Sequence, residues 1–148
     1  MRSRIAAFSL CLLGALASGG GAARIAEAGD GREAVSLAHA DREHLLAGMR
    51  RYLDSVQGIV DGLARSNMAA VAESARKAGA AMVSDISLVA IVGLPPDFLL
   101  ASMATHQKFD ELADEAKAGA TRMAVLDKLS GILATCNACH ETYRVAIR

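Results

Sequence analysis

The amino-acid sequence predicts an all-α protein, an antiparallel bundle of four helices. Apolar residues recur at three- and four-residue intervals, and short breaks divide the chain into four such stretches. Of the 148 residues, 53% are apolar but only 3% are aromatic, because alanine supplies much of the apolar content. Small side chains favour closely packed helices, and this length suits one domain.

Residues 1–28 are interpreted as a signal peptide with a lead of small residues, to be set aside before the fold is considered. Arg2 and Arg4 precede an apolar run at 5–17, as in secretory signals. The run is short for a bilayer span, so no stable membrane insertion is expected. Three cleavage positions stay open, after Ala17, Ala23 or Ala28. The mature chain is therefore expected to be exported.

The bundle is expected within residues 29–148, after an irregular lead-in at 29–40. Asp41 is the expected N-cap of a first helix that ends at Ala64. Ser66 or Asn67 is expected to cap a second helix at about 68–82.

Pro95, Pro96 and Gly119 mark the limits of helices in the second half of the chain. The apolar stretch 87–94 is expected to be a buried connection, since a lone strand would have no partner in the chain. Pro96 suits the first turn of a third helix at 96–117, and Gly119 ends it. A fourth helix is predicted at 121–146.

The fourth predicted helix carries the chemistry. Cys136, Cys139 and His140 form the pattern Cys-x-x-Cys-His, which is typical of covalent haem attachment. Cysteines three residues apart share a helix face, so both thiols can reach the two vinyl groups along one porphyrin edge. His140 follows Cys136 by four residues, which places its imidazole one turn on, towards the iron. One covalent haem c is therefore predicted near the C-terminus.

Other uses of two cysteines and a histidine fit less well. A thioredoxin-like pair needs a preceding strand, which is not predicted here. A zinc site needs a fourth ligand, and no second Cys/His pair stands at ligand spacing. Cysteines three apart on one helix are poorly placed to form a disulfide.

The ending Cys136-Asn-Ala-Cys139-His140-Glu-Thr-Tyr-Arg144, after a helix with Phe109 and many alanines, resembles the class II c-type cytochromes, which include cytochrome c-prime and its low-spin relatives. The resemblance implies a periplasmic four-helix bundle with His140 as the proximal haem ligand. It also implies that Arg144 lies over the imidazole or near a haem propionate. A solvated cation at the helix end is the alternative reading of Arg144.

The residue opposite His140 decides the function. In the resembling family it comes from the first helix, where Met49 lies centrally in the apolar stripe Leu45, Leu53, Val56 and Val60. Methionine ligation implies a low-spin carrier for one-electron transfer. Without it, the alternative is a five-coordinate haem that binds nitric oxide or carbon monoxide. His106 is expected to be a buried, hydrogen-bonded histidine and is the second candidate for the sixth ligand.

Charge and side-chain chemistry restrict the partners. Lys and Arg total 16, as do Asp and Glu, so no nucleic-acid partner is expected. No nucleophile or acid–base pair stands out, so the chain is not expected to be an enzyme. Periplasmic redox proteins are the expected partners, and the assembly state stays open between monomer and homodimer.

Overall fold

The computed structural model describes residues 29–83 and 91–148. Residues 31–148 form one compact unit, to which every element below belongs. The predicted signal peptide, at 1–28, and the first part of the predicted buried connection, at 87–90, lie outside the described residues. The described end of that connection differs from the prediction, because Val92 is 84% exposed. A turn closed by the Leu94 N–H and the Ile91 carbonyl leaves this side chain in solvent.

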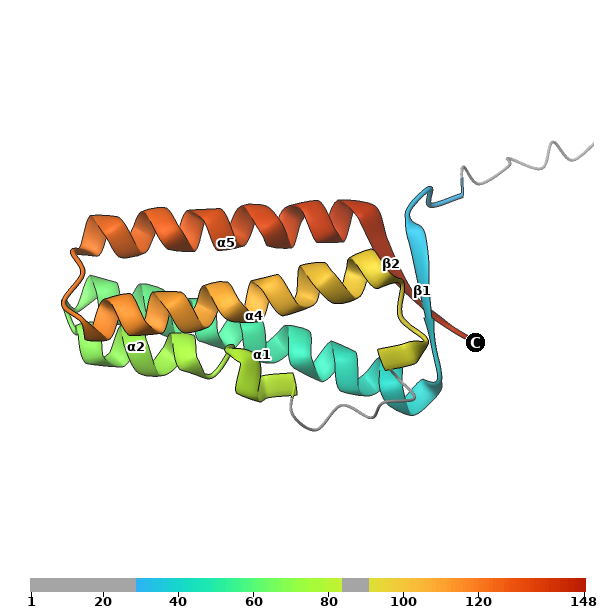
Figure 1. The fold of residues 1–148 in the computed structure, drawn as a ribbon, viewed down its shortest axis with the longest axis horizontal. Coiled ribbons are helices and arrows are strands. Elements are labelled where there is room, and N and C mark those ends of the chain that lie inside the picture. Colours follow the sequence, from blue (N-terminus) through green and yellow to red (C-terminus); the bar gives the residue numbers. More distant parts are fainter. Residues whose placement is uncertain (1–28, 84–90) are drawn as a thin grey trace, which may run out of the picture. The chain divides into compact units, whose positions relative to one another are not determined.

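Helices make up most of the described residues, which confirms the all-α prediction at the level of helix content (Figure 1). The elements are α1 (His39–Ala64), α2 (Met68–Arg76), the 3₁₀ helix η1 (Ala80–Val83), α4 (Pro96–Lys117) and α5 (Arg122–Thr142). Within this part of the chain α1 packs on α2, α2 on α4, and α4 on α5. None of the described helices is long and apolar enough to cross a membrane.

Local signals explain most helix ends. The Asn67 side chain caps α2 by accepting the Ala70 N–H at 3.0 Å, and the Thr121 hydroxyl caps α5 by accepting the Ala124 N–H at 3.2 Å. Helix α4 has the predicted bounds, and Gly119 follows it with φ +88°, a conformation that glycine adopts without strain.

Two helix ends differ from the prediction. Helix α1 begins at His39, so Asp41 lies in its first turn and is not the N-cap. Helix α2 ends at Arg76, well before Met82. The Ala78 and Gly79 N–H groups bond to carbonyls only three residues back, and a carboxylate oxygen of Asp110 on α4 accepts the Ala80 N–H at 2.8 Å in place of a helical bond.

Two strands replace the predicted lead-in and the predicted last turn of the fourth helix. Strand β1 (Glu33–Leu37) pairs in parallel with β2 (Tyr143–Ile147), and the register begins at Glu33↔Tyr143. Strand β1 alternates larger and smaller side chains, which suits a strand with one buried face. Val35 and Leu37 are buried on that face. The prediction missed the pair because its two members are far apart in the sequence.

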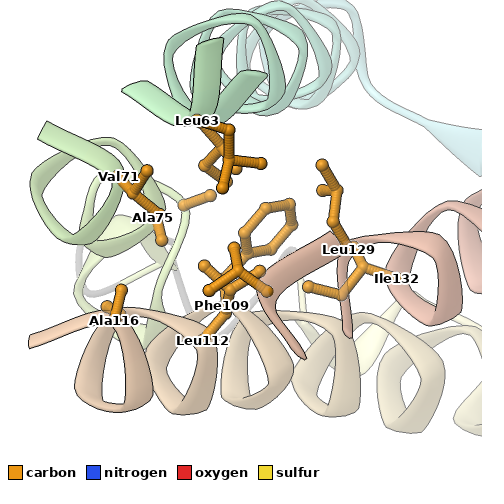
Figure 2. Packing of buried hydrophobic residues seen from close by; sticks show 12 residues of the cluster. Leu63, Val71, Ala75, Phe109, Leu112, Ala116, Leu129 and Ile132 are labelled. Carbon is orange, nitrogen blue, oxygen red and sulfur yellow. The ribbon is translucent and has the colours of Figure 1, made fainter. Parts of the chain in front are cut away.

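The main core lies between the helices. Figure 2 shows the Phe109 ring projecting from α4 into the space between Leu63 of α1, Ala75 of α2 and Leu129 of α5. Fully buried side chains of this cluster come from all four helices. A second, smaller cluster of Val35, Leu37 and Phe98 joins β1 to the beginning of α4.

Candidate functional site

The three residues of the Cys-x-x-Cys-His motif lie in the last two turns of α5. Both cysteines are free thiols and are partly buried. Cys136 packs against the main core, whereas Cys139 packs against the second cluster beside β1. His140 is exposed. The motif therefore stands where the two cores meet, with its histidine at the surface of the described fold.

A cavity of about 310 Å³ opens beside the motif, between α1, α4 and α5. Its wall brings together both thiols, His140 and, from α1, Met49. The remaining lining residues are mostly apolar and are Tyr52, Leu53, Val56, Phe98, Ala101, Ser102, Thr105, Phe109, Leu133 and Thr135. The structure thus brings together the two predicted attachment residues and both predicted axial residues, although 87 positions separate Met49 from Cys136.

The cavity lies where α1 and α5 do not pack closely against each other. Within the described residues, these two helices are not among the pairs that pack closely along their backbones. Two apolar side chains of the cavity wall, Leu53 and Leu133, are 69% and 40% exposed. Apolar groups that line an open cavity without being covered are typical of a binding site for an apolar ligand.

The apolar stripe of α1 is turned relative to the prediction. The buried face of α1 carries Gly48, Ser55, Ile59, Gly62 and Leu63, whereas Val60 is 47% exposed. The backbone of α1 comes close to α2, since a Cβ added at Gly58 or Gly62 would collide with Ser74 or Val71. Small residues therefore pack against α2, and the larger stripe around Met49 is left for the cavity.

The two thiols are in surroundings that favour the neutral form. Burial raises the pKa of Cys136 and of Cys139, and in each case this is the largest cause. A thioredoxin-type cysteine needs the opposite shift, because the thiolate is the nucleophile. Among the described residues no group of three or more His, Cys, Asp or Glu side chains is placed to hold a metal ion. The direction of these pKa shifts does not favour a redox thiol pair.

His106 is buried as predicted, and its ring is held by protein partners. The Nδ1–H group donates to the Ala78 carbonyl at 2.8 Å, so Nε2 accepts the Tyr52 hydroxyl at 2.7 Å. These two contacts supply the hydrogen bonding expected of a buried histidine. Because both nitrogens are occupied and the ring does not line the cavity, the arrangement does not favour His106 as an iron ligand.

Tyr52 is a cavity residue that the sequence analysis did not single out. It stands three residues after Met49, so helical spacing could have placed both on one face. Its ring stacks on Phe109 with centroids 5.6 Å apart. Burial, together with the negative charge that Cys136 can carry, raises the pKa of the Tyr52 hydroxyl far above its ordinary value. Tyr52 therefore stays protonated and keeps its bond to His106.

We expect the free energy of unfolding to fall less steeply at high pH in the Tyr52→Phe variant than in the wild type. Because the pKa of Tyr52 is raised in the folded state, the folded protein holds the phenolic proton more tightly than the unfolded chain does. This stabilisation is complete below the ordinary tyrosine pKa, about 10, and is lost as the pH rises towards the folded pKa. Urea denaturation at about pH 8 and about pH 11 measures it. An equal fall in the free energy of unfolding in variant and wild type would contradict the assignment.

Arg144 lies on β2 and not at the end of a helix. It alternates with Tyr143 and Val145, which pack into the second cluster, so its side chain leaves the sheet on the opposite face. It does not line the cavity, and its Nε is buried without a hydrogen-bond partner. A contact of Arg144 with an imidazole or a propionate stays a prediction.

The chain was compared with family models, with curated proteins and with solved structures, and none of them matches. The function is therefore inferred from the residues themselves and from the cavity they line.

Proposed function

We propose that this chain is an exported c-type haem protein that transfers single electrons in the periplasm. Its helices would form an antiparallel four-helix bundle like that of the class II c-type cytochromes, with one covalent haem c. The observation that carries the proposal is the cavity wall itself. Two thiols three residues apart and His140 line it from α5, and Met49 lines it from α1.

The residues present fit a haem. A porphyrin is a large, flat and mostly apolar body, and the cavity offers it aromatic and aliphatic side chains, among them Phe98 and Phe109. The exposed Leu53 and Leu133 would be covered by it. The separation of α1 from α5 provides the opening, and the free thiols stand on the same wall. Burial of these apolar groups would stabilise the loaded protein.

Each residue has a defined task in this proposal. The haem supplies an iron that changes reversibly between two oxidation states. Cys136 and Cys139 would hold the haem through thioether bonds, and His140 would be a ligand of its iron. The Met49 thioether would approach from α1, and this ligand pair favours the ferrous state and raises the potential. The apolar wall of the cavity would limit access of water to the bound group.

No substrate-transforming chemistry is proposed, and four acidic residues of α4 are engaged in ion pairs with the neighbouring helices. Arg76 of α2 pairs with Asp110 at 2.6 Å and also with Asp114. Lys128 of α5 pairs with Glu111 at 3.3 Å and also with Glu115. These contacts link α4 to its two neighbours, and three of the four carboxylates, on Glu111, Asp114 and Glu115, remain largely exposed to solvent.

A visible spectrum of the purified exported protein, recorded oxidised and reduced, tests the function. A six-coordinate low-spin haem in both states, with a reduced spectrum that carbon monoxide does not change, is the expected result. A haem that is high-spin and binds carbon monoxide at once would replace electron transfer by gas binding. A protein without haem absorption, after export from a host that matures c-type cytochromes, would overturn both.

A further inference from the structure

Strand β1 lies against the end of α5 that carries His140. The parallel pairing with β2 starts at Glu33↔Tyr143, directly after the last residue of α5. At the far end of the pair, Arg148 donates its N–H to the Leu37 carbonyl at 3.0 Å and its Nε–H to the Ser36 carbonyl at 2.8 Å. Cys139 packs into the cluster that contains Val35 and Leu37. The N-terminal segment thus pairs with the strand that directly follows the motif, and its apolar side chains pack against Cys139.

Arg32, directly before β1, adds a third contact. Its Nη1 donates to the backbone carbonyl of His140 at 3.0 Å, across 108 positions of sequence. The last four carbonyls of a helix lack partners within the helix, and cations are favoured there by the helix dipole. The Tyr143 N–H satisfies the Cys139 carbonyl, so Arg32 serves the next carbonyl along the chain. The last turn of α5 is therefore held at two successive residues of the motif.

We propose that Arg32 is a positioning residue for His140. This inference rests on the proposed function, in which His140 is the iron ligand. By holding the His140 carbonyl, Arg32 fixes the end of α5 and with it the direction of the imidazole. Its positive charge also opposes the extra positive charge of ferric iron, so it favours the reduced state. An exposed arginine outside the cavity would then help to set the potential of the haem.

The test uses the haem-loaded protein with three substitutions. Arg32→Gln removes the charge, and Arg32→Lys restores it with a donor that can reach a carbonyl. Arg148→Gln is the matched control, because it removes another exposed arginine–carbonyl bond of the same sheet, away from His140. Amide hydrogen exchange at residues 139–143 and the midpoint potential are measured for each variant.

For Arg32→Gln we expect exchange at 139–143 to become about threefold faster, the size expected for a cation at a helix C-terminus. We also expect the equilibrium constant for reduction of the haem to fall about threefold. At 59 mV per tenfold change in that constant, the midpoint potential falls by about 30 mV. Arg32→Lys should restore both quantities, and Arg148→Gln should leave both at the wild-type value. If Arg32→Gln matches Arg148→Gln in both measurements, or if lysine restores neither, the positioning role is wrong. If the wild-type protein carries no haem, the proposed function is wrong and not only the role of Arg32. The visible spectrum of the wild type reveals this before any variant is made.

Discussion

The double variant Cys136→Ser, Cys139→Ser is expected to carry no covalent haem. Both thiols line the cavity wall, and no other free cysteine is present in the described residues, so serine leaves nothing that can form a thioether. Its intact mass should equal that of the mature chain, whereas the wild type should be heavier by one haem. Each single variant retains one thiol and should attach less haem or none.

Thr135→Ser is a suitable control for this experiment. Thr135 lines the same cavity, and its hydroxyl accepts a hydrogen bond from the Lys108 ammonium group at 2.7 Å. A serine hydroxyl can keep this bond. This variant should retain the full haem mass, which shows that loss in the cysteine variants is due to the thiols. A wild-type mass equal to that of the bare chain would end the case for covalent haem.

The same double variant should also lose stability. Without a haem, the apolar wall between α1 and α5 stays open to water, and a ligand that binds only the folded state no longer stabilises it. We therefore expect lower helix content and poorly dispersed side-chain signals in nuclear magnetic resonance spectra. Sharp, dispersed signals from the haem-free chain would show instead that the two clusters suffice for an ordered fold.

Signals carried by neighbouring residues were sufficient to predict much of the helical structure. Pro96 and Gly119 mark the two ends of α4, and Asn67 and Thr121 cap α2 and α5. In each case the stop or cap depends on a side chain or backbone conformation within a few residues of the helix end. Such signals do not require knowledge of the rest of the fold.

Features that depend on distant residues were missed or misread. The β1–β2 pair joins segments at opposite ends of the described fold, so neither strand shows its partner locally. Beyond the end of α2, a helical bond is replaced by a contact with Asp110, which is on α4. The buried face of α1 was misjudged because small residues, such as Gly62, pack there against α2. An analysis of hydrophobic periodicity gives weight to large apolar side chains. It does not detect positions where small residues let the backbones of two helices come close together.

The candidate site was more predictable than the fold around it, because chemistry constrains its spacing. Cys136, Cys139 and His140 are recognised by their spacing, and Met49, which was expected from the apolar stripe of the first helix, lines the same cavity. The partners of His106 could not be predicted, since Ala78 and Tyr52 come from different parts of the chain. The contact of Arg32 with His140 was hidden for the same reason, because it depends on the unpredicted sheet.

Met49→Leu is expected to turn a low-spin haem into a high-spin one that binds carbon monoxide readily. Met49 lines the cavity together with His140, so its thioether is available on the wall that α1 contributes. Leucine has nearly the same volume, and such an exchange costs less than about 1.5 kcal/mol, so the fold should survive. Only the sulfur is lost, and with it the sixth ligand and its preference for ferrous iron. The visible spectrum and the midpoint potential, which should fall, are the measurements.

Met103→Leu is the matched control, because Met103 is 51% exposed on α4 and does not line the cavity. It should keep the wild-type spectrum and potential. If Met49→Leu also keeps the wild-type spectrum, Met49 only fills the cavity wall, and another group must stand opposite His140. His106 is poorly placed for this, since both its nitrogens are engaged by Tyr52 and Ala78. A wild type that is already high-spin leaves the sixth position open, and gas binding then follows from the same cavity.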